Sequence, residues 1–584
     1  MFRRTSFTAE LASPSTIADH SFAIRRPNSA DLHESAANEN IPYLPSPTLL
    51  NPRTSLSQSI NSLASIDETQ PLLSNDSIAS YAETALTTEF SVLARLSVPA
   101  CISYTSTFIA LIVTQAFIGN MDSTSLAAAA LASTYCNVTG NSVLIGAASS
   151  LDTLCSQCFG SSKSDRALAV IFQRGVILAL ALCAPIALLW MHSGTLLSYT
   201  GQDAHVVSLA TSYISIMIWG LPASALAETL RRFFQSQAQM HVALATTTAA
   251  SITTIFLSSY LIFHTPLAFL GAPLALTVAT WLQLVLLVAY SLLFGHAAIW
   301  TVDSSELFAG WSVWRSHAEK SLAGIVVVAG EWWAWEVGTL LAGVLGTASL
   351  SAHAMVLSLC SLTAMVPMGL GVAASTRTGI LVGQGSPQGA QKSARCALAA
   401  AALVGALNCC FLFFGAGYLP HLFSHDPDPV TLAQSALPWA ALFQVSDALA
   451  TTSAGILRGM GRQSVSAGLA LVGFYGVGIP AGAFMCFKWK TLVGLWMGLL
   501  LGTFVSVLQA GVVLCADWDT ECVRAAEAVE VAAARKENTD APEADSGAKG
   551  VDAISTPSST NKTMFGRKPK RAPGPTLYSS SVYT

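Results

Sequence analysis

The sequence predicts an all-α polytopic membrane protein with about twelve transmembrane helices, arranged as two six-helix lobes. The first reason is composition: 52% of the 584 residues are hydrophobic and 11% are charged, whereas roughly a quarter of the residues in a soluble domain are charged. The second is a series of long, continuously apolar runs, which favour helices over the alternating strands of about ten residues that build membrane barrels. The third is an internal repeat.

The positions of the spans follow from their length. A helix that rises about 1.5 Å per residue needs roughly 20 apolar residues to cross a hydrocarbon layer of about 30 Å. In the first half of the chain, runs of this length cover residues 92–118, 123–147, 168–192, 205–227, 242–264 and 268–292. In the second half they cover residues 321–345, 349–373, 393–416, 431–455, 464–486 and 493–516.

Two pairs of segments carry the repeat. The stretch "GAASSLDTLCSQCFGS" (146–161) aligns without a gap with "GVAASTRTGILVGQGS" (371–386), and "LRRFFQSQ" (230–237) resembles "LRGMGRQ" (457–463). The first pair comes after the second span of each half, and the second pair after the fourth. Equivalent segments are therefore separated by an even number of helices. This spacing predicts parallel repeats, related by a pseudo-two-fold axis along the membrane normal.

Several charges fall near the predicted ends of spans. Asp152 and Arg377 occupy equivalent positions of the repeat, and Glu228 lies at the end of the fourth span. We expect structural roles for all three: capping of helices, pairing with nearby arginines, or an ion pair between the lobes formed by Asp152 and Arg377.

The ends of the chain differ in composition from the spans. Ser, Pro, Asn and Thr dominate the N-terminal segment, and the C-terminal segment is similar. Such segments cannot bury enough apolar surface to fold, and no cleavable signal peptide precedes the first apolar run. We therefore expect a disordered cytosolic tail (1–88), an N-terminal lobe (89–300), a cytosolic loop (301–320), a C-terminal lobe (321–516) and a largely disordered cytosolic tail (517–584).

Short loops predict that both termini lie in the cytosol. In that orientation the external loops carry essentially only Lys488 and Lys490, whereas the internal loops are rich in Lys and Arg. A cytosolic N-terminal tail would also allow "ETQPLL", with Glu68, Leu72 and Leu73, to bind a sorting adaptor as an acidic dileucine signal. We expect a multi-pass protein of the vacuolar or plasma membrane.

Composition and motifs exclude other classes of function. A net charge of −4 without an Arg/Lys-rich face argues against a nucleic-acid partner. The cysteines lie mostly within spans as small hydrophobic residues, and Cys155 and Cys158 lack the second pair that a metal site needs. The spans contain no metal-binding or nucleophile constellation. We therefore expect neither an enzyme nor a cofactor or metal site.

The stretch "AGEWWAWEVG" (329–338) places two acids inside the seventh span. A charge there costs about 2.5–3.5 kcal/mol on insertion scales, so Glu331 and Glu336 indicate function. At about 100° per residue, both acids share one helix face with Trp332 and Trp335. Carboxylates attract a cation, and indole rings add cation–π attraction. The face is typical of a wall that binds a cationic, aromatic ligand; simple packing is the alternative for the tryptophans.

Asp447 makes a similar case in the tenth span. Gln444 and Thr451 lie within about 80° of Asp447 around the helix, so the span has a polar stripe. We expect Gln444 and Thr451 to line a substrate pocket together with Trp332 and Trp335. Because the first half of the chain has no comparably deep acid, we expect coupling in the C-terminal lobe.

These motifs resemble a known family. The chain is similar over about residues 89–516 to the eukaryotic form of the multidrug and toxic compound extrusion (MATE) family. The resemblance rests on "SSLDTLCSQCFG" (149–160), "GEWWAWEVG" (330–338), "MVPMGLGVAASTRTG" (365–379) and "AGILRGMGRQ" (454–463). It implies a two-lobe antiporter that exports organic cations and other small molecules in exchange for protons.

The resemblance also implies roles for single residues. It places essential acids at Glu331, Glu336 and Asp447, and aromatic pocket residues at Trp332 and Trp335. One position departs from the pattern, because animal members carry a further Glu in the eighth span. In this chain that position is Ser358, so their substrate range does not transfer directly.

Competition for one set of carboxylates would couple the two flows. Desolvation disfavours a charged acid, so Glu331, Glu336 or Asp447 would bind a proton on the more acidic side, and a cationic substrate would expel it. Sodium coupling is one alternative; it requires oxygen ligands clustered near an acid, and the first-half spans lack a suitable carboxylate. A transporter-like membrane sensor is another, and its tails would need signalling modules.

Overall fold

The computed structural model describes residues 75–161, 165–199, 201–301, 307–308 and 310–533. The chain divides into two units, Met1–Ile78 and Ala79–Thr584, and the second contains the helical body described here. All regular elements in the described ranges are helices, as the sequence predicts. The predicted sorting signal at Glu68, Leu72 and Leu73 lies outside these ranges.

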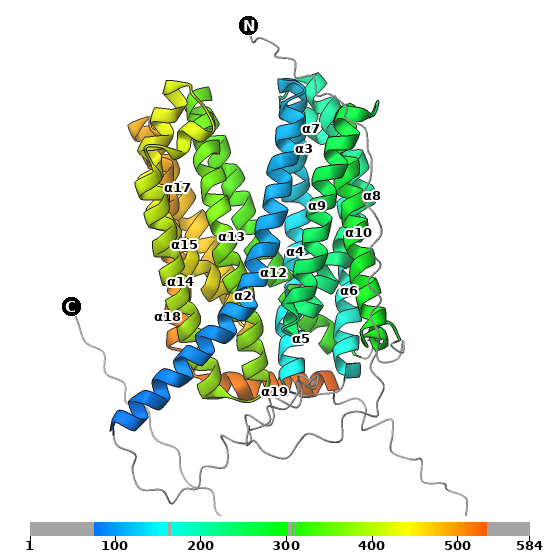
Figure 1. Cartoon of the computed structure of the whole chain (residues 1–584), viewed down its shortest axis with the longest axis vertical. Coiled ribbons are helices and arrows are strands. Elements are labelled where there is room, and N and C mark those ends of the chain that lie inside the picture. The colour runs from blue at the N-terminus through cyan, green and yellow to red at the C-terminus, as the bar shows by residue number, and fades with distance from the viewer. Residues whose placement is uncertain (1–74, 162–164, 200, 302–306, 309, 534–584) are drawn as a thin grey trace, which may run out of the picture. The chain divides into compact units, whose positions relative to one another are not determined.

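Two bundles of helices form the body (Figure 1). The N-terminal lobe contains α2 (Asn75–Gly119), α3 (Ser123–Cys136), η1 (Asn137–Asn141), α4 (Ser142–Ala148), α5 (Ser150–Gly160), α6 (Asp165–Met191), α7 (Ser193–Ser198), α8 (Ala204–Ser236), α9 (Met240–His264), η2 (Ala268–Leu270), α10 (Gly271–Leu293) and η3 (Ala297–Trp300). The C-terminal lobe contains α12 (Trp311–Val344), α13 (Thr347–Gly383), α14 (Pro387–Gly415), η4 (Leu419–Leu422), α15 (Pro427–Met460), α16 (Gln463–Leu471), η5 (Val472–Gly478), α17 (Ile479–Trp489) and α18 (Leu492–Leu514). A last helix, α19 (Trp518–Ala533), follows.

The helices match the predicted spans. Ten helices in the described ranges are long and apolar enough to cross a membrane. The other two predicted spans lie in the run from α3 to α5, which the π-helix η1 interrupts, and in α15, a helix of 34 residues. Prolines stand inside several helices, which membrane helices tolerate because neighbouring groups satisfy the freed carbonyls. The fold is the expected one of about twelve helices in two lobes.

Each lobe has two apolar cores. In the N-terminal lobe one core surrounds Trp190, and the other surrounds Phe172 and Phe233. In the C-terminal lobe one core surrounds Trp496, and the other contains Leu457 together with residues of α13, α14 and α19. A smaller core joins Leu96 of α2 and Met240 of α9 to Val372 of α13, so apolar packing also crosses between the lobes.

The two lobes pack closely at one end of the body. Gly146 of α4 meets Gly324 of α12 so tightly that a Cβ on Gly324 would overlap the Gly146 carbonyl oxygen. Gly160 of α5 and Gly383 of α13 approach the opposing backbone in the same way. Small residues permit this contact because no side chain stands between the helix backbones.

Hydrogen bonds reinforce this contact between the lobes. Gln157 Nε2 donates to the carbonyl of Gly459 at 2.9 Å, and Gln463 Nε2 donates to the carbonyl of Ser149 at 3.2 Å. Helix α19 lies across the same end of the body (Figure 1) and packs against α5 of one lobe and α13 and α14 of the other. We call this the α19 end. At the α19 end, the two lobes are therefore held together by backbone contacts, by hydrogen bonds and by α19.

The structure adds helix where the sequence led us to expect loop or tail. Helix α12 begins at Trp311, inside the expected loop 301–320, and α19 occupies part of the expected tail 517–584. Trp518, Cys522, Ala525 and Val529 of α19 are buried. Their spacing places them on one helix face, so burial of this apolar stripe stabilises a segment that is too polar to span a membrane.

Of the alternatives for Asp152 and Arg377, an ion pair between the two residues is not formed. Arg377 instead binds Glu89 of α2, with Nε–Oε1 and Nη2–Oε2 distances of 2.9 Å. Asp152 pairs with Arg232 of its own lobe and with Arg458 of the other lobe. Asp152 and Glu228 thus pair with arginines, which is another of the expected structural roles. Equivalence in a repeat relates two positions by symmetry, which does not bring them into contact.

Candidate functional site

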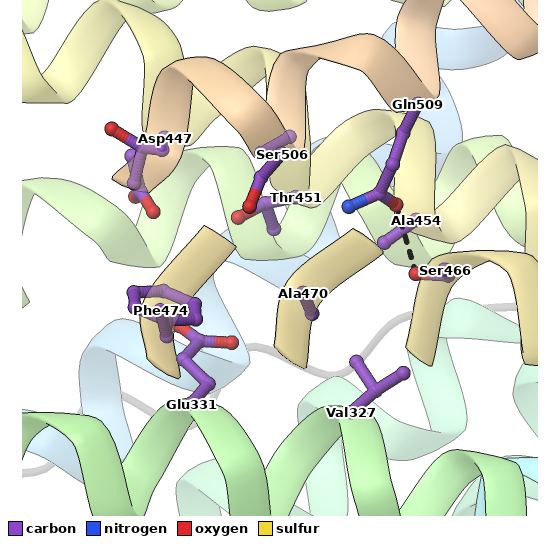
Figure 2. A pocket seen from close by; sticks show the side chains of 12 residues that line it. Val327, Glu331, Asp447, Thr451, Ala454, Ser466, Ala470, Phe474, Ser506 and Gln509 are labelled. Atoms are coloured by element: carbon purple, nitrogen blue, oxygen red, sulfur yellow. Dashed lines mark hydrogen bonds between the residues drawn. The ribbon is translucent and has the colours of Figure 1, made fainter. Parts of the chain in front are cut away.

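A cavity inside the C-terminal lobe holds two of the predicted acids (Figure 2). The space between its lining residues, including the part that is open to the surroundings, is about 380 Å³. Helices α12, α15, α16 and α18 and the π-helix η5 form its walls. The lining residues are Val327, Glu331, Asp447, Ala450, Thr451, Ala454, Ser466, Ala470, Phe474, Thr503, Ser506 and Gln509.

The two acids enter the cavity from different walls. Glu331 rises from α12 and is half-buried, whereas Asp447 projects from α15 and is 9% exposed. Their charges interact, and Thr451 lies one helical turn beyond Asp447 on the same wall. The structure therefore brings Glu331, Asp447 and Thr451 together.

Close backbone packing shapes the wall opposite α12. Gly473 and Gly478 of η5 approach Gly502 of α18 so closely that a Cβ on Gly502 would meet the Gly473 carbonyl oxygen at 2.5 Å. The π-helix places an extra residue in one turn, so its side chains shift in register relative to a regular α-helix. Phe474 projects into the cavity from this segment.

Polar side chains on α16 and α18 complete the cavity. Ser466 Oγ donates a hydrogen bond of 2.8 Å to Gln509 Oε1, as the dashed line in Figure 2 marks. Thr503 bonds to Ser446 of α15 at 2.7 Å. The cavity is thus lined by two carboxyl groups and several neutral oxygen atoms, with apolar residues between them.

The charge of this lining is one-sided. No Lys, Arg or His stands among the residues that line the cavity. Two ionised carboxylates at such a place repel each other, and each would be stabilised by a bound proton or cation. The geometry can therefore bind a proton or a positively charged ligand, and binding of one disfavours the other.

The comparisons with known proteins decide the family. A family model described as MatE matches residues 99–260 and 324–484, which together make up more than half of the chain. The chain belongs to the MATE family. Each matched segment falls within one lobe, which agrees with the repeat in the sequence.

Three similar proteins illustrate the relationship. The mouse multidrug and toxin extrusion protein 2 is 33% identical over 71% of this chain and 72% of its own length. The human multidrug and toxin extrusion protein 1 is 32% identical over 75% of this chain and 76% of its own length. The crystal structure of the eukaryotic MATE transporter AtDTX14 aligns with a TM-score of 0.71 and 29% identity, over 76% of this chain and 99% of that one. As a MATE protein, the chain is a membrane efflux transporter.

Two further predicted residues of this MATE protein lie beside the cavity, in the protein core. Trp335 packs against Phe443 and Trp496, with ring centroids 5.4 and 6.0 Å apart, and its indole lies within hydrogen-bonding reach of Glu331. Gln444 is fully buried and accepts a hydrogen bond of 3.0 Å from Thr363 of α13. Neither residue lines the cavity.

Glu336 and Trp332 also lie apart from the cavity. Glu336 lies beside Thr134 of α3, in the other lobe. Trp332 is half-buried and is not among the lining residues. The single functional face that we expected on α12 is therefore divided. The two acids are about 140° apart around the helix, so one carboxyl points into its own lobe while the other points to its neighbour.

Sequence reasoning missed the parts of the cavity wall that α16, η5 and α18 contribute. Ser466, Ser506 and Gln509 are polar residues inside apolar runs, and this contrast was the available signal. The sequence did not reveal which helices face one another, so these residues had no assigned partner.

Proposed function

We propose that this MATE transporter is a secondary active antiporter that exports organic cations in exchange for protons. Glu331 and Asp447 form its coupling site in this proposal. The observation that supports it is the pairing of two carboxyl groups in one cavity without a basic lining residue. Its relatives are named as multidrug and toxin extrusion proteins, which suits a cavity for small molecules.

Exchange follows from competition for the two carboxyl groups. A proton on Glu331 or Asp447 removes the charge that attracts a cationic substrate, and a bound cation favours the ionised acids. For a one-to-one exchange, each pH unit across the membrane corresponds to about 1.4 kcal/mol, or about tenfold in the substrate gradient. Trp335 and Gln444 do not line the cavity, and in this proposal they stabilise the positions of the residues that do. We assign Glu336, which lies beside Thr134 of the other lobe, to the path between the lobes rather than to the coupling site.

The same proposal gives the protein an orientation. Lys392, Arg395 and Arg462 lie in segments near the α19 end, whereas Lys488 lies in the last turn of α17 and Lys490 directly follows that helix. The positive-inside rule then directs the α19 end and both termini to the cytosol. Epitope tags at the two termini, tested for antibody access in intact and permeabilised cells, check this orientation.

Transport by purified protein tests the coupling. The full chain is reconstituted into liposomes with an imposed pH gradient and no sodium, and uptake of a fluorescent organic cation is followed. We expect gradient-driven uptake in the wild type and its loss in Glu331→Gln and Asp447→Asn. The control is Glu319→Gln, because Glu319 lies on the same helix, is exposed and pairs with Arg315 at the surface.

Each outcome has a clear meaning. Wild-type uptake in Glu331→Gln and Asp447→Asn, at equal protein content, would refute the role of both acids. Loss of uptake in Glu319→Gln as well would indicate a general defect of the variants. Gel filtration of each variant establishes that the protein is folded.

One observation favours sodium as a second candidate ion. Hydroxyl groups of Thr451, Thr503 and Ser506 stand in the same cavity as the two acids, and sodium prefers such oxygen ligands. Replacing the pH gradient by a sodium gradient in the same liposomes distinguishes the candidates. Uptake that follows only the sodium gradient would reject proton exchange.

A further inference from the structure

A cluster of charged side chains lies where the two lobes meet at the α19 end. Asp152 of α5 accepts from Arg232 of α8 at 2.5 Å, and Glu228 accepts from Arg231 and Arg232 at distances of 2.5 to 3.0 Å. Arg458 of α15 contributes from the other lobe, with its Nε 3.4 Å from Asp152 Oδ2. The cluster has three guanidinium groups and two carboxylates.

Arg458 is the one member of this cluster that comes from the C-terminal lobe, and it lacks a local acid. In the repeat it corresponds to Arg231, which binds Glu228 three residues earlier on its own helix. The residue three before Arg458 is Gly455. A Cβ at Gly455 would overlap the carbonyl oxygen of Gly371, so the close packing of α13 on α15 leaves no room for a carboxylate there.

Arg458 therefore depends on acids that are farther away. One is Asp152, across the boundary between the lobes. Glu331 is another, and its charge interacts with that of Arg458. The guanidinium is therefore paired with an acid of the opposite lobe and also interacts electrostatically with Glu331 of its own lobe.

A second cavity adjoins the cavity of Glu331 and Asp447 and reaches Arg458. It is lined in part by Arg458, Gln463 and Ser149, and it shares Val327 and other residues with the cavity of Glu331 and Asp447. The residues of α15 that line the two cavities form a single stripe along the helix. Asp447, Thr451, Ala454 and Arg458 follow at spacings of four, three and four residues, which places them on one helix face. The stripe runs from the acid cavity to the boundary between the lobes.

We propose that Arg458 is a gating residue that transmits the charge of the Glu331 and Asp447 cavity to the contact between the lobes. This inference rests on the proposed function of the two acids. Ionised cavity acids draw the guanidinium toward the cavity and weaken its bond to Asp152. Protonated cavity acids no longer attract Arg458, so its guanidinium stays paired with Asp152. This pair holds the α19 end closed.

Other charged and titratable groups near Arg458 do not cancel this competition. Arg231 and Arg232 repel it, and Glu228 is bound by these two arginines. Tyr104 of α2 also faces the cluster, with the guanidinium of Arg231 5.5 Å from its ring centroid. The groups whose protonation changes the balance are then Glu331 and Asp447.

The gating role of Arg458 predicts how the contact between the lobes at the α19 end changes with pH. As the pH falls and the cavity acids take up protons, the fraction of molecules closed at the α19 end rises. As the pH rises, this fraction falls. Without the charge of Arg458, the pH no longer changes the distance between the lobes at this end, although the acids still titrate.

Spin labels on the two lobes measure that distance. Ala238, between α8 and α9, and Gln384, after α13, are exposed at the α19 end of different lobes. Each is changed to Cys in the full chain, after the exposed Cys410 and Cys515 are changed to Ser. Double electron–electron resonance in lipid nanodiscs then gives distance distributions at about pH 5 and about pH 8.

Three variants isolate the role of Arg458. In the wild type we expect the ratio of closed to separated molecules to change about fivefold or more between the two pH values. Arg458→Gln should abolish the change, and Arg458→Lys, which keeps the charge, should restore part of it. Arg231→Gln is the matched control from the other repeat, and it should keep the wild-type response because Arg231 binds a local acid.

The outcomes separate this inference from the proposed function. A wild-type response in Arg458→Gln, an unresponsive wild type, or an equal loss in Arg231→Gln would overturn the gating role. If Glu331→Gln and Asp447→Asn lose proton-driven transport while Arg458→Gln keeps its pH response, only the gating inference fails. If the acid variants transport normally, the proposed function fails first.

Discussion

Arg377 of α13 holds Glu89 of α2 with two parallel hydrogen bonds of 2.9 Å each. This fork joins the first helix of one lobe to the second helix of the other, and both side chains are largely shielded from solvent. Removing Arg377 leaves the carboxylate of Glu89 largely buried without its two-bond partner. We expect Arg377→Gln to lower the free energy of unfolding by roughly 3 kcal/mol, and Arg377→Lys by less.

A thermal unfolding assay on the purified protein measures this loss. Arg315→Gln is the control, because Arg315 and Glu319 form an exposed pair with side chains 69% and 61% accessible. Exposed pairs contribute about 0–1 kcal/mol. Equal melting temperatures for Arg377→Gln and Arg315→Gln would contradict the structural role of the fork.

Gly324 predicts a separate effect on the contact between the lobes. Its missing side chain lets α12 touch the backbone of α4, so Gly324→Ala should push the lobes apart at the α19 end. Gly343→Ala on the same helix is the control, because nothing lies within 4 Å of the added Cβ. Spin-label distances between Ala238 and Gln384 should lengthen in the first variant and stay unchanged in the second.

Trp335 combines packing with a polar contact, and two substitutions separate them. Trp335→Ala removes a ring from the core around Phe443 and Trp496, and we expect it to cost about 3 kcal/mol of folding free energy. Trp335→Phe retains most of the packing but removes the N–H near Glu331. It should unfold close to the wild-type temperature while the pH profile of transport shifts. An unshifted profile would leave Trp335 with a packing role alone.

Glu521 anchors α19 through charge as well as through its apolar face. It is 1% exposed and binds Arg462, which follows α15, and Arg524 of its own helix. Glu521→Ala should leave Arg462 without its carboxylate and loosen α19. Limited proteolysis should then cleave within Trp518–Ala533 several times faster, whereas Glu527→Ala, on the exposed side of α19, should be cleaved at the wild-type rate.

The sequence was a good guide to the helices because each span in a membrane must satisfy its own backbone hydrogen bonds. It was a weaker guide to the site. Glu331, Asp447 and Thr451 could be found because polar side chains are rare inside apolar runs, but the same pattern assigned Glu336 to one face with Glu331. Which lobe each acid contacts depends on how the helices pack against one another. The sequence of a single helix does not show this packing.

Short amphipathic segments show the same limit. The apolar stripe of α19 has helical spacing, yet the segment of 16 residues is too short and too polar for a membrane span, so the sequence predicts a tail there. The partner of Asp152 could not be read from the sequence either. The repeat made Arg377 one candidate, whereas in the structure Asp152 pairs with Arg232 and Arg458.

Helix α19 also imposes an order on biosynthesis. It is the last described helix to be made, yet it packs against α5, which belongs to the first lobe to leave the ribosome. Domains generally begin to fold as they are synthesised, N-terminal part first. The two lobes can therefore insert one after the other, but their joint at the α19 end is complete only after the chain has been translated through residue 533.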